Sequence, residues 1–422
     1  MKKIKVFCLA DSPLAPSGVG TQTRYMIEGL LQTGRFEFVC FGGAIRHPDY
    51  KPIKTEEYGE DWIIYPVDGY GTQEQVRALL KAQKPDIVWI MTDPRFWSWL
   101  WDIDNEIRSV APLVYYHVWD NLPYPTFNRK WYLSNDVVAS ISKVTDDIVR
   151  NVAPEVKTRH LPHAVNDSIF CKIQDTDLIK GFKRENNLGV DSNGNKRFTF
   201  FWNNRNARRK QSGSLIFWFN DFLDKVGRDK ATLIMHTEPK DPNGQDLIAI
   251  KDKLNLDDNQ LKLSTLKLSM QQLSVLYNAV DCTINISDAE GFGLATLESL
   301  ATETPIIVNM TGGLQEQVTN GKEWFGIGIE PCSKAIIGSQ EVPWIYEDRL
   351  SGRDVVDAMV KMYEMSEEDR KSMGTAGRHH VMTNYSMNKY ISMWDELLTQ
   401  THEEHGSWET KKGNLWSLNK VL

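Results

Sequence analysis

Two glutamates bracket a glycine turn at residues 290–298, whose letters are EGFGLATLE. An apolar strand precedes this turn and an apolar-periodic helix follows it. Backbone amides and the dipole of a helix amino terminus attract phosphate, and glycine lets a ligand approach closely. Glu290 precedes the glycines and Glu298 lies on the first helical turn, so both carboxylates could accept hydrogen bonds from hydroxyls. The pattern predicts a diphosphate held between two hydroxyl-binding groups, which is what a nucleotide-sugar needs.

A basic run at residues 205–210, with the letters RNARRK, is a second candidate site. Arg205 and Lys210 could converge on one anion, Arg as a fixed two-pronged donor and Lys as a mobile charge. A leaving diphosphate needs such neutralisation. The commoner fate of a basic run is a solvated turn, and we expect Arg208 and Arg209 to lie in solvent. A nucleic-acid contact is a further alternative that would require a wider basic patch.

A glycine turn also follows the first predicted strand. Gly18 and Gly20 open a helix there, and they would let the backbone approach a phosphate. The turn is not a dinucleotide fingerprint, because Thr23 replaces the third glycine and residues 42–43 are glycines where an acidic ribose ligand would stand. A plain structural turn is an equally good interpretation.

Several candidate side chains follow strands of the first half of the chain. His117 ends one strand, where it could hydrogen-bond a sugar or an acceptor hydroxyl, although a lone His in this place is more often structural. Trp119 and Asp120 follow it, and Trp97 follows the preceding strand at the same edge. These aromatic rings could stack on a sugar or a nucleobase. An aromatic core under a loop is the alternative.

Other catalytic signatures are missing from the sequence. It contains no P-loop, no nucleophile elbow, no HExxH and no zinc-ligand spacing. Asp102 and Asp104 match an Asp-x-Asp pair, but they fall inside a probable helix. We therefore expect no metal site and no cofactor.

The elements that must position these residues form two series. Short apolar runs alternate with helix-like segments, which is typical of parallel α/β sheets. The fold class is therefore α/β, with two Rossmann-like doubly wound domains whose ligands are expected at strand carboxyl ends, in a cleft between the domains. The predicted strands are 4–10, 36–41, 62–65, 86–91, 113–117, 137–141 and 158–161 in the first series, and 198–202, 232–236, 261–264, 282–286, 305–308 and 326–329 in the second.

A polar stretch separates the two series. We place an amino-terminal domain at 1–170, a linker at 171–196 and a carboxyl-terminal domain at 197–384. Residues 385–398 have apolar side chains at helical spacing, so a final helix and tail are predicted for 385–422.

Composition narrows the class of protein. At 422 residues the chain suits two domains, and its net charge of −7 offers no global attraction to nucleic acid or anionic membranes. Five scattered cysteines without a CxxC pair fit a reducing compartment. No signal peptide or membrane span is recognisable. We expect a cytoplasmic protein, or one in the host cytoplasm if the source is viral.

Taken together, these features resemble the family 4 retaining glycosyltransferases of GT-B architecture, over nearly the whole chain. The resemblance rests on the first glycine turn, on His117, on the Arg-x4-Lys element and on the Glu-x7-Glu signature, which is followed by residues 311–316, TGGLQE. It departs from the usual family pattern in two places. The first helix start lacks adjacent glycines, and the Arg-x4-Lys element carries extra basic residues, with no glycine before Gly213. The final helix is similar to one that crosses back to the amino-terminal domain in this family.

The resemblance implies a role for each motif. It implies metal-independent transfer of a sugar from a UDP- or GDP-linked donor to a glycan or small-molecule acceptor. Two alternatives stay open, namely the same chemistry on hydroxymethylated bases of DNA and a catalytically silent nucleotide-sugar sensor. The donor identity and the oligomeric state cannot be derived from the sequence. The implied residues are Glu290, His117, Arg205 and Lys210 for catalysis, Gly18, Gly20, Phe292, Gly293, Leu294, Ala295 and Glu298 for the donor, and Trp97, Trp119 and Asp120 for the acceptor.

Overall fold

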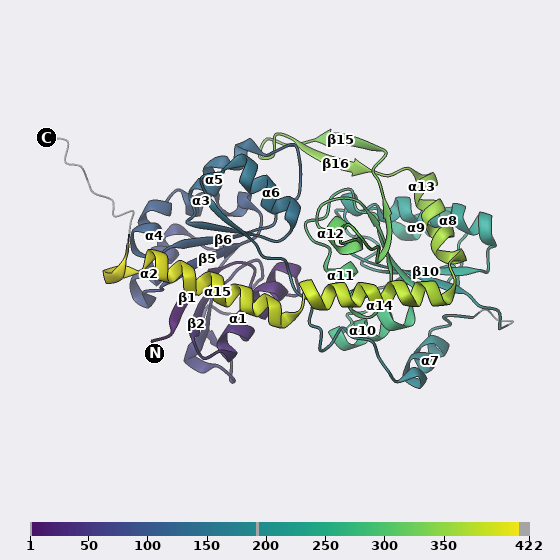
Figure 1. The fold of residues 1–422 in the computed structure, drawn as a ribbon, viewed down its shortest axis with the longest axis horizontal. Helices are drawn as coiled ribbons and strands as arrows, with labels where there is room; N and C mark the ends of the chain where they lie inside the picture. Colours follow the sequence, from purple (N-terminus) through teal and green to yellow (C-terminus); the bar gives the residue numbers. More distant parts are fainter. Residues whose placement is uncertain (1, 191–193, 413–422) are drawn as a thin grey trace. The chain divides into compact units, whose positions relative to one another are not determined.

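The computed structural model describes residues 2–190 and 194–412, which form two compact units (Figure 1). Unit 1 comprises Met1–Ala164, Gly338–Pro343 and Met387–Leu422, and unit 2 comprises Val165–Ile337 and Trp344–Ser386. Two units were expected from the sequence, with the change of domain at a linker over 171–196. The structure groups that segment with unit 2. The expected tail extends beyond the described residues from 413 onward.

Unit 1 is built on an eight-stranded sheet with the order β3-β4-β2-β1-β5-β6-β7-β8. All neighbours are parallel except β3 and β4. The chain runs outward from β1 and then returns to β5 on the other side of β1, so the order reverses between these two strands. The elements are β1 Ile4–Leu9, α1 Gly18–Gln32, β2 Phe36–Gly42, β3 Ile53–Lys54, β4 Trp62–Pro66, α2 Gln73–Gln83, β5 Ile87–Met91, α3 Ser98–Trp101, α4 Asp104–Val110, β6 Leu113–His117, α5 Arg129–Leu133, β7 Val137–Ser140, α6 Lys143–Val152, β8 Lys157–His160 and α15 Met387–His405.

The last long helix, α15, belongs to unit 1 and packs against α1. An added Cβ on Gly29 would lie only 2.3 Å from Ile391, so the small residue lets the two helices approach closely. The Tyr390 hydroxyl donates to a carbonyl of α1 at 3.1 Å. Trp394 is fully buried and meets Trp89 of the sheet edge-on. The predicted return of the final helix to the amino-terminal unit is confirmed.

Unit 2 has a six-stranded, wholly parallel sheet with the order β11-β10-β9-β12-β13-β14. The order reverses between β9 and β12, which makes this pair the topological switch point. Its elements are α7 Thr176–Glu185, β9 Phe198–Asn203, α8 Ser212–Val226, β10 Ala231–His236, α9 Leu247–Lys253, β11 Leu261–Ser264, α10 Met270–Ala279, β12 Cys282–Asn285, α11 Leu294–Ala301, β13 Ile306–Asn309, α12 Leu314–Val318, β14 Gly326–Ile329, β15 Ser333–Ile337, β16 Ile345–Arg349, α13 Gly352–Glu364 and α14 Glu367–Asn384.

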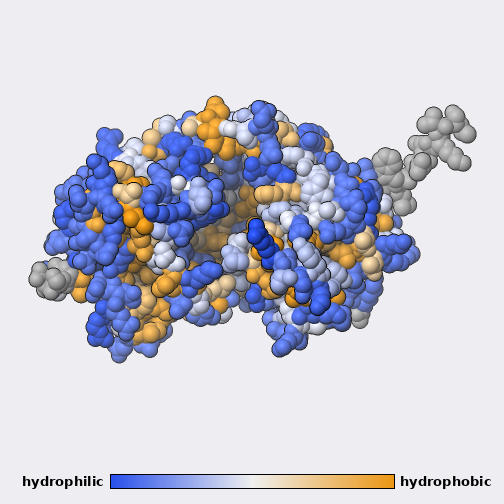
Figure 2. All heavy atoms as spheres, turned by 180° about the vertical axis from the view of Figure 1, so that it is seen from behind, coloured by the Kyte–Doolittle hydropathy of each residue, from blue (hydrophilic) through white to orange (hydrophobic). Residues whose placement is uncertain are grey.

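The two sheets account for the apolar runs of the sequence. The central strands are buried on both faces, as parallel sheets covered by helices require. Hydrophilic residues predominate on the molecular face shown in Figure 2, where hydrophobic residues form only small groups. No helix of the described residues is both long and apolar enough to cross a membrane.

The thirteen predicted strands are all present, with ends that differ by at most one residue. The sequence analysis missed β3, which has two residues, and the antiparallel β15–β16 hairpin, whose side chains are mostly exposed or half-buried. It also missed α7 inside the expected linker, because no residue of that helix is fully buried. Asp102 and Asp104 lie where α3 ends and α4 begins, not inside one helix as predicted.

Candidate functional site

The principal candidate site of unit 2 lies in the loops that follow β9 and β12, at the carboxyl ends of the two strands where the sheet order reverses. A third loop, at residues 311–313, supports the loop after β12. The Gly313 amide donates to the Glu290 carbonyl at 3.0 Å. A Cβ on Gly313 would lie 2.7 Å from the Gly291 carbonyl oxygen, so only glycine fits there without displacing the turn. The Gly-Gly pair in the sequence therefore shapes the Glu290 turn.

Helix α11 begins directly at this turn. Gly293 caps the helix with φ +91°, a left-handed conformation that favours glycine. The Leu297 amide is the first to bond back to the Gly293 carbonyl, at 3.2 Å. The amides of Leu294 and Ala295, on the first turn, therefore have no partner within the helix. Phe292 is buried and packs edge-on against Tyr385, so it anchors the turn. The geometry suits an anion at the α11 amino terminus.

Lys210 and Glu290 form an ion pair across 80 residues of sequence. Their side chains are only 8% and 12% exposed. The Glu290 carboxylate also accepts from the Asn285 amide at 3.3 Å and the Ser287 hydroxyl at 3.4 Å. Burial alone would raise the pKa of Glu290, but the cations of Lys210 and Arg209 outweigh it and lower this pKa to about 2. Glu290 is thus a fixed carboxylate with a cation beside it.

The backbone that carries Lys210 is tied to the loop after β12. A short 3-10 turn, Arg208–Lys210, ends at Gln211, whose φ of 55° turns the chain into α8. The Gln211 amide donates to the Asp288 carboxylate at 2.5 Å, and the Asp288 amide donates to the Arg209 carbonyl at 2.8 Å. These bonds join the two loops and explain why Lys210 meets Glu290. The sequence offered no signal for Gln211 or Asp288, because their partners lie far along the chain.

Arg205 and Lys210 do not share a partner, although they were expected to converge. The Arg205 guanidinium makes two hydrogen bonds to Asp241, at 2.6 and 3.2 Å, and its side chain is 65% exposed. This pairing lowers the pKa of Asp241 to about 2. Arg205 would have to share or leave Asp241 to contact an anion.

The two basic residues that were expected to lie in solvent are exposed but have protein partners. Arg208 pairs with the buried carboxylate of Glu347. Arg209 donates to the Ala289 carbonyl, and its charge contributes to the low pKa of Glu290. Arg209 therefore belongs to the electrostatics of the site, which the sequence analysis missed.

Glu298 has an environment opposite to that of Glu290. Its carboxylate accepts from the Tyr277 hydroxyl at 2.9 Å, and that hydroxyl accepts from the Asn203 amide at 3.0 Å. Burial raises the pKa of Glu298 to about 7, and the Tyr277 bond opposes this only in part. The two carboxylates of the signature thus differ in charge near neutral pH.

In unit 1, His117 is fully buried at the end of β6. Its Nδ1 lies 2.9 Å from the Tyr115 hydroxyl and its Nε2 lies 2.7 Å from the Tyr132 hydroxyl. Because Tyr115 donates its proton to the Thr92 carbonyl at 2.8 Å, the Nδ1 of His117 carries the hydrogen. Burial lowers the pKa of His117 to about 3, so the ring is neutral. A role next to a sugar stays a prediction.

The other candidates of unit 1 lie at the ends of β1, β5 and β6. The Gly20 amide donates to the Ser17 hydroxyl at 3.0 Å, which caps α1, and Gly18 is the first residue of that helix. Trp97 is fully buried and donates to the Met91 carbonyl at 3.0 Å. Trp119 is buried and Asp120 is half-buried. Their predicted phosphate and acceptor contacts stay predictions.

Known proteins resemble this chain in part of its sequence and in its fold. Residues 228–379 match the family described as "Glycosyl transferases group 1". A trehalose synthase of Thermococcus litoralis is 23% identical over 130 residues, which cover 30% of this chain and 26% of that protein. The chain therefore matches about a quarter of the length of this curated relative.

Two solved structures resemble nearly the whole chain. Sucrose-phosphate synthase from Thermosynechococcus elongatus superposes with a TM-score of 0.73 at 15% identity, covering 96% of this chain and 100% of that one. The Anabaena protein HepE in complex with UDP and glucose superposes with a TM-score of 0.68 at 14% identity, covering 94% and 100%. The GT-B fold predicted from the sequence is confirmed.

Proposed function

We propose that this protein is a glycosyltransferase that moves a sugar from a nucleotide-diphosphate-sugar to an acceptor hydroxyl. The buried Lys210–Glu290 pair beside the open amides of α11, at the switch point of unit 2, carries the proposal. In this pair Lys210 is a cation that could bind a phosphate, and Glu290 is a carboxylate that could accept hydrogen bonds from sugar hydroxyls. The family match over residues 228–379 covers α11 and supports it.

The proposed donor site uses both ends of the signature. Glu290 orients the hydroxyls of the transferred sugar, and Glu298 accepts hydrogen bonds from the ribose. Lys210 and the α11 amides hold the diphosphate. Arg205 also contacts the diphosphate, after it gives up its ion pair with Asp241. Its side chain is exposed, and its planar guanidinium can donate two hydrogen bonds to a carboxylate or to a phosphate. The expected acceptor residues of unit 1 complete the proposal.

The proposed reaction retains the anomeric configuration and needs no metal. The bond from the anomeric carbon to the phosphate oxygen breaks, and Lys210 neutralises the charge that develops on the leaving diphosphate. The acceptor oxygen attacks the oxocarbenium-like centre from the face that the leaving group vacates. A phosphate oxygen of the departing diphosphate takes the acceptor proton. No protein nucleophile is used, and Glu290 stays an orienting carboxylate.

The test measures the hydrolysis of UDP- and GDP-sugars without acceptor, in the presence of a chelator. We expect slow nucleotide release from one donor, lost in Glu290→Gln and kept in the control Glu330→Gln, which changes an exposed carboxylate. Full activity of a folded Glu290→Gln variant would contradict the assignment. If no donor is hydrolysed but one raises the melting temperature, the sensor interpretation gains support.

A further inference from the structure

A hollow in unit 2 lies at the opposite ends of the strands from the candidate donor site. It has a volume of about 640 Å³ and is lined by α7, by residues 187–190, by Arg197 just before β9 and by Asn259 just before β11. The candidate donor site follows the carboxyl ends of β9 and β12, whereas this hollow adjoins the amino-terminal ends of β9 and β11. Because the strands are parallel, the two places lie at opposite ends of the strands of one sheet.

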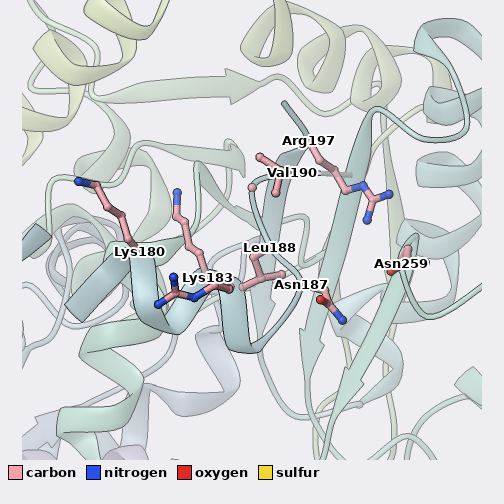
Figure 3. A pocket seen from close by; sticks show the side chains of 9 residues that line it. Lys180, Lys183, Asn187, Leu188, Val190, Arg197 and Asn259 are labelled. Atoms are coloured by element: carbon pink, nitrogen blue, oxygen red, sulfur yellow. The ribbon is translucent and has the colours of Figure 1, made fainter. Parts of the chain in front are cut away.

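The charged side chains that line this hollow are all cationic among the residues that the structure describes. They are Lys180, Lys183, Arg184 and Arg197, and no carboxylate of residues 2–190 and 194–412 lines it. Figure 3 shows Lys180 and Lys183 on one side and Arg197 on the other, next to Asn259, with Leu188 between them. Cations on two sides of one hollow repel each other, and a bound anion removes that repulsion. In a chain with a net charge of −7, such a cluster is a local exception.

These cations are poorly neutralised by the protein. Arg197 is only 7% exposed, and its one hydrogen bond in the described chain runs from Nε to the Asp229 carbonyl at 3.2 Å. Within residues 2–190 and 194–412, neither Lys183 nor Arg184 forms an ion pair, although Lys183 adds to the effect of Lys196 in lowering the pKa of Glu367. Lys180 has a weak pair with Asp177 at 3.6 Å on the same helix turn. A buried guanidinium without a carboxylate is costly unless a ligand supplies the anion.

Lys183 also lines a second hollow, in which the charges are mixed. That hollow has a volume of about 420 Å³, and the carboxylates of Asp281, Glu303 and Glu367 line it together with Lys183 and other cations. Desolvation lowers the pKa of Lys172, Glu303 opposes this, and the cations of Lys183 and Lys371 lower it further. Lys183 thus lines both hollows, but only in the first are the charged residues of the described lining all cationic.

We propose that the hollow bounded by α7, Arg197 and Asn259 binds a small molecule with two or more phosphate groups. Lys183 and Arg184 contact one phosphate and Arg197 contacts another, with Leu188 under the apolar part of the ligand. The volume lies in the range typical of small-molecule sites. Because the site stands apart from the donor loops, its ligand is a regulator or second substrate rather than the donor.

The experiment is calorimetric titration of inorganic pyrophosphate into the full chain. Lys183→Ala/Arg184→Ala is the test variant, because both side chains lie on α7, which has no fully buried residue and tolerates the change. Lys253→Ala/Lys322→Ala removes two exposed lysines elsewhere in unit 2 and is the matched control. We expect the test variant to bind at least about tenfold more weakly and the control to bind like wild type. Circular dichroism confirms folding in each variant.

A second pair of variants separates this site from the proposed donor site. Pyrophosphate binding by the hollow should persist in Lys210→Met, which removes the diphosphate-binding cation of the proposed donor site, and nucleotide-sugar hydrolysis should persist in Lys183→Ala/Arg184→Ala. Equal pyrophosphate affinity in wild type and Lys183→Ala/Arg184→Ala overturns the proposal, as does the absence of binding to wild type. If a short single-stranded oligonucleotide binds these cations far more tightly than pyrophosphate, an extended polyanion replaces the small ligand and the proposal is wrong.

Discussion

At the scale of single residues, Glu290 and Glu298 show how neighbours set the chemistry of identical side chains. Glu290 precedes α11 by four residues, and Glu298 is the fifth residue of α11, one turn later than the sequence predicted. Both side chains are partly or mostly shielded from water. A cation touches Glu290, whereas only a neutral hydroxyl touches Glu298. The pKa of the first falls to about 2 and that of the second rises to about 7. Near neutral pH, only Glu298 changes charge.

Donor binding should therefore depend on pH through Glu298. A ribose that donates two hydrogen bonds needs the ionised carboxylate, and the raised pKa leaves Glu298 mostly protonated below pH 7. We expect the affinity for the hydrolysed nucleotide-sugar to rise about tenfold between about pH 6 and about pH 8. Both phosphates of such a donor are esterified, so they lack the titration near pH 6 of a phosphate monoester. Equilibrium titration across this range measures the effect, which Glu298→Gln should abolish; an unchanged slope in that variant contradicts it.

The raised pKa of Glu298 also makes folding stability depend on pH, but stability falls with rising pH whereas donor affinity rises. The contribution of Glu298 to the free energy of unfolding is fully present below the unfolded pKa of about 4.3 and is lost as pH rises through about 7. Glu290 behaves inversely, because its lowered pKa contributes stability above about 4.3 that is lost as pH falls towards about 2.

Lys210→Met should destabilise unit 2. It leaves the Glu290 carboxylate in a mostly buried place without its cation, which costs about 3 kcal/mol. The loss should be largest near neutral pH and should shrink below about pH 4, because in the variant Lys210 no longer opposes the effect of burial and Glu290 becomes protonated there. Urea unfolding midpoints at both pH values measure it. The double variant Lys210→Met/Glu290→Gln should regain part of the loss, and a single variant as stable as wild type would refute the pairing.

At the scale of elements, the site depends on how closely two loops approach. The turn before α11 is held by the loop before α12, where a Cβ on Gly313 would lie 2.7 Å from both the Gly291 carbonyl oxygen and the Phe292 Cα. These contacts are with backbone atoms, which cannot rotate away. The position of the α11 amides is therefore coupled to the identity of residue 313.

Gly313→Ala should weaken donor binding more than it weakens folding. Gly313 has φ −69°, so alanine meets no backbone strain and acts only by pushing the Glu290 turn. We expect a loss of stability of about 1–3 kcal/mol and a further loss of nucleotide-sugar affinity. Gly181→Ala is the control, since a Cβ there meets open space. Calorimetric melting measures the loss of stability and donor titration measures the loss of affinity. A donor affinity equal to wild type in Gly313→Ala would contradict the prediction, because the turn would then move without effect on the site.

At the scale of the whole molecule, the two units differ in how the chain builds them. Unit 1 needs segments from both ends of the sequence, because α15 packs on α1 and brings Trp394 against the sheet. Unit 2 carries the donor candidates Lys210, Glu290 and Glu298, whereas the predicted donor contacts of Gly18 and Gly20 belong to unit 1. Damage to α15 should therefore leave the donor loops intact.

Trp394→Ala tests this division. Removal of the fully buried indole should cost unit 1 about 3–5 kcal/mol. Donor binding by unit 2 should stay within about twofold of wild type at temperatures where unit 1 is folded. Scanning calorimetry and donor titration measure both quantities. Trp324→Ala, at a half-exposed position of unit 2, should change neither the stability nor the donor affinity much. A loss of stability as large as that of Trp394→Ala would contradict this prediction.

Local patterns in the sequence determined the elements of this protein. Apolar runs located the strands because a parallel sheet buries both faces of its central strands, and this needs no knowledge of partners. Glycine positions located the helix starts, because their conformational freedom is a local property. The Glu-x7-Glu signature placed Glu290 and Glu298 on either side of one such start.

Only the tertiary structure decided which side chains meet. Lys210 forms an ion pair with Glu290 across 80 residues, and Arg205 forms one with Asp241 instead of sharing an anion with Lys210. The ring of His117 lies between the hydroxyls of two tyrosines. The order of the strands brings the loops after β9 and β12 together, and burial then shifts the pKa values of the groups between them. A contact between distant residues depends on this packing, which no local pattern of residue types encodes.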